Sequence, residues 1–139
     1  MNLLVRSISF ALLFAILCGG CSKPGPKLVP AKGIITVKGK AAGGIAIQFL
    51  PDVKESADGV FPSSQAISKE DGSFELYTMD NQPGAVVGPH KIVLVDSEEE
   101  RPEQGKAATK PPRIDPGYAV AGKLTATVTE GKLIELVIP

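Results

Sequence analysis

The chain has 139 residues, with 15 Lys and Arg side chains against 15 Asp and Glu side chains, so its net charge is close to zero. This balance offers no overall attraction to a nucleic acid or an anionic surface, and we expect no nucleic-acid partner. The 15 glycines and 12 prolines, together with the lack of long helix-forming runs, indicate a chain of strands and turns.

The first part of the chain has the composition of a secretory signal peptide. One cation, Arg6, precedes an apolar run from Ile8 to Leu17 that leads into small residues. A membrane-spanning helix needs about 20 apolar residues, which this run does not reach. A core helix would carry polar positions at helical spacing, and Phe10 to Leu17 has none. We therefore expect residues 1–20 to be a signal peptide that is removed.

The end of this segment indicates lipidation. No A-x-A pattern for ordinary signal-peptidase cleavage is present, and Gly19-Gly20-Cys21 resembles the lipobox of bacterial lipoproteins. Cys18 stands at the third position before the cysteine, where the family usually has an aliphatic residue. The resemblance implies processing by the lipoprotein enzymes, a diacylglyceryl thioether on Cys21 and an acylated amino group. Ser22 is not the Asp associated with inner-membrane retention, so we expect anchoring in the cell envelope, at the outer rather than the inner membrane.

The same two cysteines have a C-x-x-C spacing, which raises redox and metal alternatives. A thioredoxin-like motif needs a strand before it and a helix after it, and a haem attachment motif needs His where Ser22 stands. Because neither context is present, we expect no cofactor. Once Cys18 leaves with the signal peptide and Cys21 carries lipid, the mature chain has no free thiol and no disulfide, so its core alone must hold the fold.

Removal of the signal peptide leaves enough chain for one domain with a single core. Residues 21–31 contain three prolines and no periodicity, and we expect them to form a lipidated flexible tether. Residues 32–139 are expected to form the folded domain, held off the membrane by the tether.

Alternating apolar residues predict strands along this domain. Residues 33–38 and 45–49 alternate on either side of a Gly-rich break and are expected to pair. Lys69-Glu70-Asp71-Gly72 is typical of a hairpin turn, here between a short strand at 66–67 and a strand at 74–78.

The second half of the domain continues this pattern. Residues 90–95 are apolar on both faces, as in a central strand covered by the core on one side and partly on the other. The charged and Pro-containing stretch 98–112 is expected to be a mobile surface loop. Residues 124–129 and 133–138 alternate around Glu130-Gly131-Lys132 and are expected to form a hairpin. About seven short strands separated by turns indicate an all-β fold, an antiparallel seven-stranded β-sandwich.

Several turn and core positions together resemble the carboxypeptidase regulatory-like domain. The matching residues are Gly33, Ile35, Val37, Gly39 and Lys40; Gly43, Gly44, Ile45, Ile47, Phe49 and Pro51; Asp71, Gly72, Ser73, Phe74, Leu76 and Thr78; and Gly84, Ala85, Gly88, His90, Lys91 and Ile92. More narrowly, the chain from Gly33 to Pro139 is similar to small lipoproteins common in planctomycete bacteria. The resemblance implies a transthyretin-like sandwich without catalytic residues. His90 departs from the aromatic residue that the family usually has there.

The residues that could carry chemistry each have a structural alternative. His90, the only histidine, is expected at a strand start facing the core, and no orienting carboxylate or nucleophile is marked beside it. Asp71-Gly72-Ser73 lacks the spacing of a calcium loop and fits a turn. Ser63 and Ser64 have no G-x-S-x-G elbow. We therefore expect no catalytic residue, no metal site and no enzyme activity.

Tyr77 and the acidic run Glu98, Glu99 and Glu100 are the candidate interaction surface, although an acidic run is usually a solvated segment. The leading hypothesis is a non-enzymatic, lipid-anchored envelope module with a structural or protein-interaction role and an unknown envelope protein as partner. The alternative is a surface carbohydrate-binding module. Against it, the chain has no Trp to build a stacking platform. The aromatic residues of the mature domain are Phe49, Phe61, Phe74, Tyr77 and Tyr118.

The substitution Cys21→Ser tests the lipidation site. Without the thiol no thioether forms, so we expect a folded protein that is soluble or remains uncleaved, whereas the parent protein is membrane-associated. Cell fractionation and the mass of the N-terminal peptide measure the two properties. Cys18→Ser is the control, because Cys18 is expected to leave with the signal peptide. Membrane association of Cys21→Ser with processing intact would contradict the lipoprotein prediction.

Overall fold

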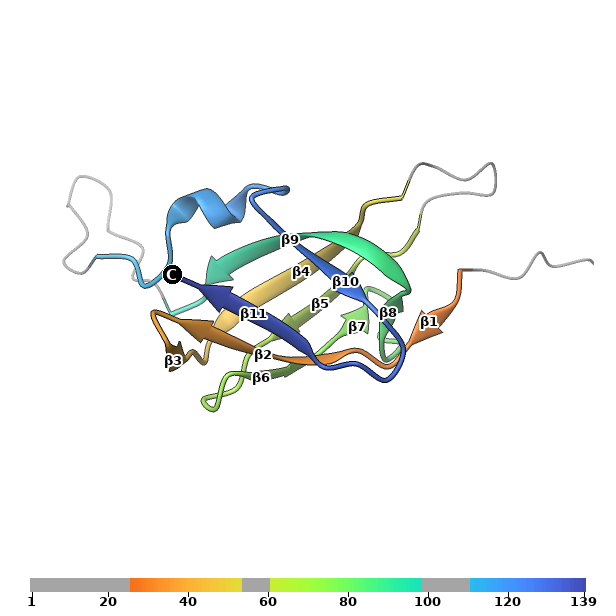
Figure 1. Cartoon of the computed structure of the whole chain (residues 1–139), viewed down its shortest axis with the longest axis horizontal. Coiled ribbons are helices and arrows are strands. Elements are labelled where there is room, and N and C mark those ends of the chain that lie inside the picture. The colour runs from red at the N-terminus through yellow and green to blue at the C-terminus, as the bar shows by residue number, and fades with distance from the viewer. Residues whose placement is uncertain (1–25, 54–60, 99–110) are drawn as a thin grey trace, which may run out of the picture.

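The computed structural model describes residues 26–53, 61–98 and 111–139, and these residues form two β-sheets that pack against each other. Figure 1 shows β11 and β2 side by side, with β4, β5 and β9 in the neighbouring layer. The expectation of an all-β fold is confirmed for this part of the chain. The predicted signal peptide, Cys21, Glu99 and Glu100 lie outside the described residues.

One sheet has five strands, each antiparallel to its neighbours, in the order β10-β9-β4-β5-β7. The long strands β4 and β9 lie in its interior, as the apolar character of residues 90–95 on both faces predicted. The bounds are Leu124–Val128 for β10, Gly88–Asp96 for β9, Ile45–Pro51 for β4, Ser64–Ile67 for β5 and Tyr77–Thr78 for β7.

The other sheet has four strands, with β2 between β11 on one side and both β3 and β6 on the other. Strand β11 runs parallel to β2, so the prediction of a purely antiparallel sandwich is wrong for this pair. A separate short pair joins β1 to β8. The bounds are Lys32–Val37 for β2, Lys40–Ala41 for β3, Ser73–Glu75 for β6, Ile134–Ile138 for β11, Leu28–Val29 for β1 and Ala85–Val86 for β8.

Two of the predicted hairpins are wrong. Strands β2 and β4 lie in opposite sheets, and so do β10 and β11. Gly44 and Gly131, with φ of 70° and 74°, turn the chain at these two places so that it crosses between the layers. A connection that crosses the core and a hairpin within one sheet both direct the same alternate side chains inward, so alternation alone does not distinguish them.

The turn at residues 69–72 is confirmed, but the strand after it is divided. Gly72, with φ of 78°, donates its N–H to the carbonyl of Lys69 at 2.8 Å, and the Lys69 N–H reaches the Ser73 carbonyl at 2.8 Å. Strand β6 then pairs with β2, and β7 pairs with β5 in the other sheet. The chain therefore passes from one layer to the other at Leu76, which is fully buried.

The structure also changes the strand count and the start of the domain. The described residues contain eleven strands rather than seven, because four pieces of two residues each were too short to show alternation. At the N-terminal side, Val29 and Ala31 are part of the core, although the sequence predicted a tether up to residue 31. The domain thus begins at Leu28, in β1.

The core is the contact between the inward faces of the two sheets. Phe49 of β4 and Phe74 of β6 meet across it, with ring centroids 6.3 Å apart. Gly33 makes room for Phe74, because a Cβ at that position would lie 2.3 Å from Phe74 Cζ. Strands β2, β4, β9 and β11 supply most of the other buried aliphatic side chains: Ile35, Val37, Ile45, Ile47, Ile92, Leu94, Ile134, Leu136 and Ile138.

Truncation of the central aromatic residue tests this packing. Phe49 is fully buried, so Phe49→Ala should lower the free energy of unfolding by about 3–5 kcal/mol, through lost apolar burial and the cavity left behind. Val137, which is 66% exposed on β11, is the control. The substitution Val137→Ala should change the free energy of unfolding by no more than about 0.5 kcal/mol. Urea denaturation of both variants measures the difference. Equal destabilisation would contradict this description of the core.

Candidate functional site

A shallow groove of about 520 Å³ lies on the outer face of the five-stranded sheet, among the described residues. Three of its aliphatic side chains are largely exposed: Ile67 at 66%, Met79 at 68% and Val95 at 47%. None of the residues that line it carries a charge. The side chains that shape the groove belong to Gln48, Gln65, Ile67, Tyr77, Met79, Asn81, Val93 and Val95.

Strand register explains why these residues share one face. Across four neighbouring strands, Tyr77 is paired with Gln65, Gln65 with Gln48, and Gln48 with Val93. Neighbouring strands are about 4.8 Å apart, so the four side chains form a row across the sheet, with two amides between an aromatic ring and an aliphatic side chain. Ile67 and Val95 flank Ala46 in the next row. The row gives the groove hydrogen-bonding groups within an otherwise apolar floor.

Sequence analysis found Tyr77 but missed most of the groove. The available signal was Val93 and Val95, since apolar residues on both faces of one strand indicate that the outer face is also partly covered. Met79 and Ile67 gave no such signal, because β5 and β7 are too short to show which side each residue faces. The side that Ile67 faces follows from its pairing with Ala46 of β4, and Met79 comes directly after β7.

Glu98 lies apart from this groove and is held by a buried ion pair. The carboxylate of Asp96, 2% exposed, accepts two hydrogen bonds from the Arg113 guanidinium, of which the Nε bond to Oδ2 measures 2.6 Å. These bonds hold the pKa of Asp96 below its usual value. Arg113 Nη1 also lies 3.3 Å from Glu98 Oε2. Tyr77 lines the groove, and Glu98 is not among the described residues that line it.

His90 lies in the core, 1% exposed, with its ring centroid 5.6 Å from that of Phe49. Its Nδ1 is 3.0 Å from the carbonyl of Gly88, which only accepts, so Nδ1 carries the proton and donates it. Nε2 is buried without a hydrogen-bond partner among the described residues. Burial holds the pKa of His90 below its ordinary value of 6.5, although the bond to Gly88 acts in the opposite direction. The His90 ring is therefore neutral and packs in the core, out of contact with solvent.

The other chemically suggestive residues have structural contacts. Asp71 Oδ1 accepts from the backbone N–H of Ser73 at 2.9 Å and from its hydroxyl at 2.6 Å, as in a turn. The buried Ser64 donates its hydroxyl to the carbonyl of Gly84 at 2.9 Å. Within residues 26–53, 61–98 and 111–139, no three His, Cys, Asp or Glu side chains come together as a possible metal site. None of the described segments is a helix with the length and apolar content needed to cross a membrane.

No protein-family model, curated protein or solved structure matches this chain. The resemblance to the carboxypeptidase regulatory-like domain and to small lipoproteins therefore stays a prediction.

The buried imidazole has a measurable consequence for stability. Below pH 6.5 the unfolded chain binds a proton at His90 that the folded protein does not, so the free energy of unfolding falls as the pH drops from 6.5 towards the lower folded pKa. The variant His90→Leu should lack this fall in the free energy of unfolding. Denaturation curves between about pH 7.5 and about pH 5 measure it, and this is the range in which an unperturbed His titrates.

The ion pair at Asp96 provides an internal control for that experiment. Its folded pKa is also lowered, so its contribution is present above the ordinary value of 3.8 and is lost as the pH falls from there towards the folded pKa. This second, more acidic loss should remain in His90→Leu and become smaller in Asp96→Asn, because Asp71 and Asp115, whose pKa values are also lowered, contribute to it as well. If His90→Leu kept the slope of the parent protein between pH 5 and about pH 6.5, the assignment of that slope to His90 would be wrong.

Proposed function

We propose that this protein is a non-enzymatic, lipid-anchored module of the cell envelope that binds a partner protein through the outer face of its five-stranded sheet. The observation that carries the proposal is the groove, in which Ile67, Met79 and Val95 leave apolar surface in contact with water. We also propose that the sandwich is of the transthyretin-like type, which rests on the motif positions given above.

The chemistry of the groove favours a protein partner with an uncharged, largely apolar surface. Covering a large aliphatic side chain contributes about 1.5–3 kcal/mol when burial is complete, and soluble proteins seldom leave many such side chains together in water. Tyr and Met, here Tyr77 and Met79, are among the residues enriched at protein interfaces. No ion pair within the groove would have to be desolvated, because none of its lining residues is charged.

The anchor is the second part of the proposal. A thioether-linked diacylglyceryl group and an acylated amino group at Cys21 provide more than one chain, and two or more chains anchor a protein stably where one binds only marginally. The anchored domain would then search for its partner in the plane of the membrane, with lipoprotein-processing enzymes needed only during maturation.

A carbohydrate ligand is the second candidate, and the row of Tyr77, Gln65 and Gln48 favours it. Amide groups donate to and accept from hydroxyls, and an aromatic face stacks on the apolar side of a sugar ring. Tyr77 is, however, the only aromatic residue lining the groove. The aliphatic floor is therefore better suited to a protein surface.

Site-specific photo-crosslinking in intact cells tests the proposal. A photoreactive amino acid at Met79, in the groove, should give a discrete crosslinked species that Ile67→Asp abolishes, because a charge there has to be desolvated in the complex. The same group at Val137, equally exposed on the other sheet, is the control and should give none. Circular dichroism of the Ile67→Asp protein confirms that it is folded.

Two outcomes would overturn the protein-partner proposal. The first is identical crosslinking from Met79 and Val137, or crosslinking that Ile67→Asp leaves unchanged. The second is saturable and competable binding of the purified domain to a glycan array that Tyr77→Ala abolishes, which would establish the carbohydrate function instead.

A further inference from the structure

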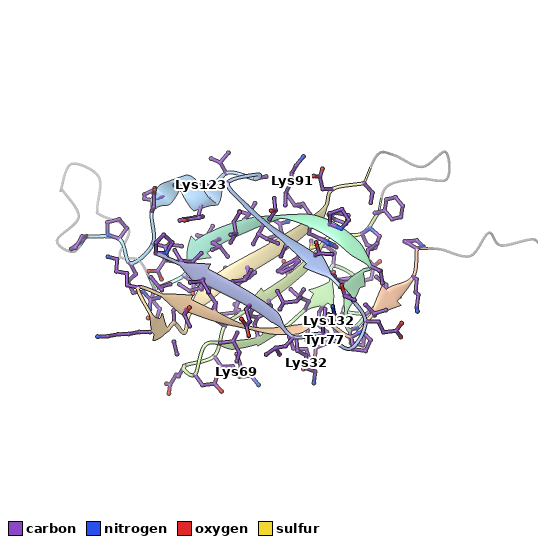
Figure 2. The ribbon with its side chains drawn as sticks, viewed as in Figure 1. Lys32, Lys69, Tyr77, Lys91, Lys123 and Lys132 are labelled. Atoms are coloured by element: carbon purple, nitrogen blue, oxygen red, sulfur yellow. The ribbon has the colours of Figure 1, made fainter. Side chains whose placement is uncertain are left out.

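A second hollow, of about 320 Å³, lies at the end of the sandwich that contains β1 and shares no described lining residue with the groove. It is lined by Pro30, Lys32, Gly131, Lys132 and Leu133. Leu133 is 57% exposed, and the lining contains two ammonium groups and no carboxylate. Figure 2 labels Lys32 and Lys132 in the part of the ribbon where β11 begins. We call these residues the lysine cleft.

The lysine cleft lies next to the point at which the N-terminal segment joins the domain. Leu28 of β1 is paired with Val86 of β8, and the Val87 N–H donates to the carbonyl of Lys27 at 3.4 Å. Lys27 Nζ also lies 2.6 Å from Glu130 Oε2, in the connection between β10 and β11. These contacts hold the first described residues against the turn that supplies Lys132 and Leu133.

Covalent geometry then limits how far this end lies from the anchor. Cys21 is seven residues before Leu28, and a chain spans at most about 3.3–3.6 Å per residue, so the two Cα atoms are no more than about 25 Å apart. This step rests on the proposed lipidation of Cys21. Under that condition, the β1 end of the sandwich is the end held next to the bilayer.

The chemistry of the lysine cleft fits the headgroup region of a membrane. Lysine places its aliphatic stem on apolar surface while its ammonium group reaches phosphate, and an exposed Leu beside it inserts at the boundary with the acyl chains. Lys32 has a partner, Glu75, at 3.3 Å, whereas Lys132 makes no ion pair with another described residue. The local lining is therefore cationic although the whole chain is close to neutral.

We infer that the lysine cleft rests on the lipid bilayer in the anchored protein, with Lys32 and Lys132 against lipid phosphates and Leu133 at the interface. The domain is thereby oriented on the membrane rather than free on its tether. The groove belongs to the other sheet and stays open to a partner.

A single tryptophan reports this orientation, because the chain has none of its own. The variant Leu133→Trp is produced as the full, processed and lipidated protein and reconstituted into vesicles of phosphatidylethanolamine and phosphatidylglycerol with brominated acyl chains. We expect the bromine to quench most of its fluorescence. Val95→Trp, a comparably exposed aliphatic position on the other sheet, is the control and should keep its fluorescence. Thermal unfolding confirms that both variants are folded.

The charges are tested in the same vesicles. Lys32→Glu together with Lys132→Glu should restore most of the fluorescence of Leu133→Trp, whereas replacement of both by Arg should leave it quenched. Lys38→Glu together with Lys40→Glu, beside the turn between β2 and β3, is the matched control and should also leave it quenched.

The outcomes separate this inference from the proposed function. Lipid on Cys21 in the mass spectrum, with equal quenching of the two tryptophan variants or quenching of Val95→Trp alone, would overturn the orientation while leaving the anchor intact. Quenching that the Glu substitutions do not relieve would overturn the role of the two lysines. A mass spectrum without lipid on Cys21 would overturn the anchor, and the orientation with it.

Discussion

The contact between Phe49 and Phe74 across the two sheets is the interaction on which the rest of the structure depends. The residues that the structure describes contain no cysteine, so their two sheets are held together by covering their inner faces, and these two rings are the bulkiest groups that meet there. Gly33 leaves the space that Phe74 fills, and His90 also packs against Phe49. The outer faces are free of this requirement, and they carry the groove and the lysine cleft.

The sequence predicted the all-β class and most of the long strands because their apolar residues alternate. Residues 45–49 are a clear example, since Ile45, Ile47 and Phe49 are buried while Ala46 and Gln48 between them are half-buried. It did not predict which strands pair. The chain leaves β2 for β4 by crossing the core, and a crossing has the same alternation as a hairpin. The parallel pairing of β11 with β2 joins two segments far apart in the sequence, which no local pattern specifies.

The candidate site was predictable only in part, for similar reasons. Tyr77 was recognised by its residue type, but Gln48 and Gln65 are ordinary surface amides until strand pairing places them in one row. Glu98 was expected in a solvated acidic run; its side chain is 65% exposed and also lies beside Arg113, whose partner Asp96 is buried at the end of β9. An ion pair between residues on either side of a long connection has no signature in the sequence between them.

The parallel pairing of β11 has a consequence for biogenesis. Gly33, near the start of the domain, pairs with Phe74 of β6 on one side and with Ile134 of β11 on the other, so the four-stranded sheet cannot be completed while the later part of the chain is still being made. Contacts between distant segments slow folding, because the chain entropy of closing the loop is lost before the contact forms. The same arrangement makes β11, with Ile138 buried at its end, sensitive to anything that keeps this last strand from docking.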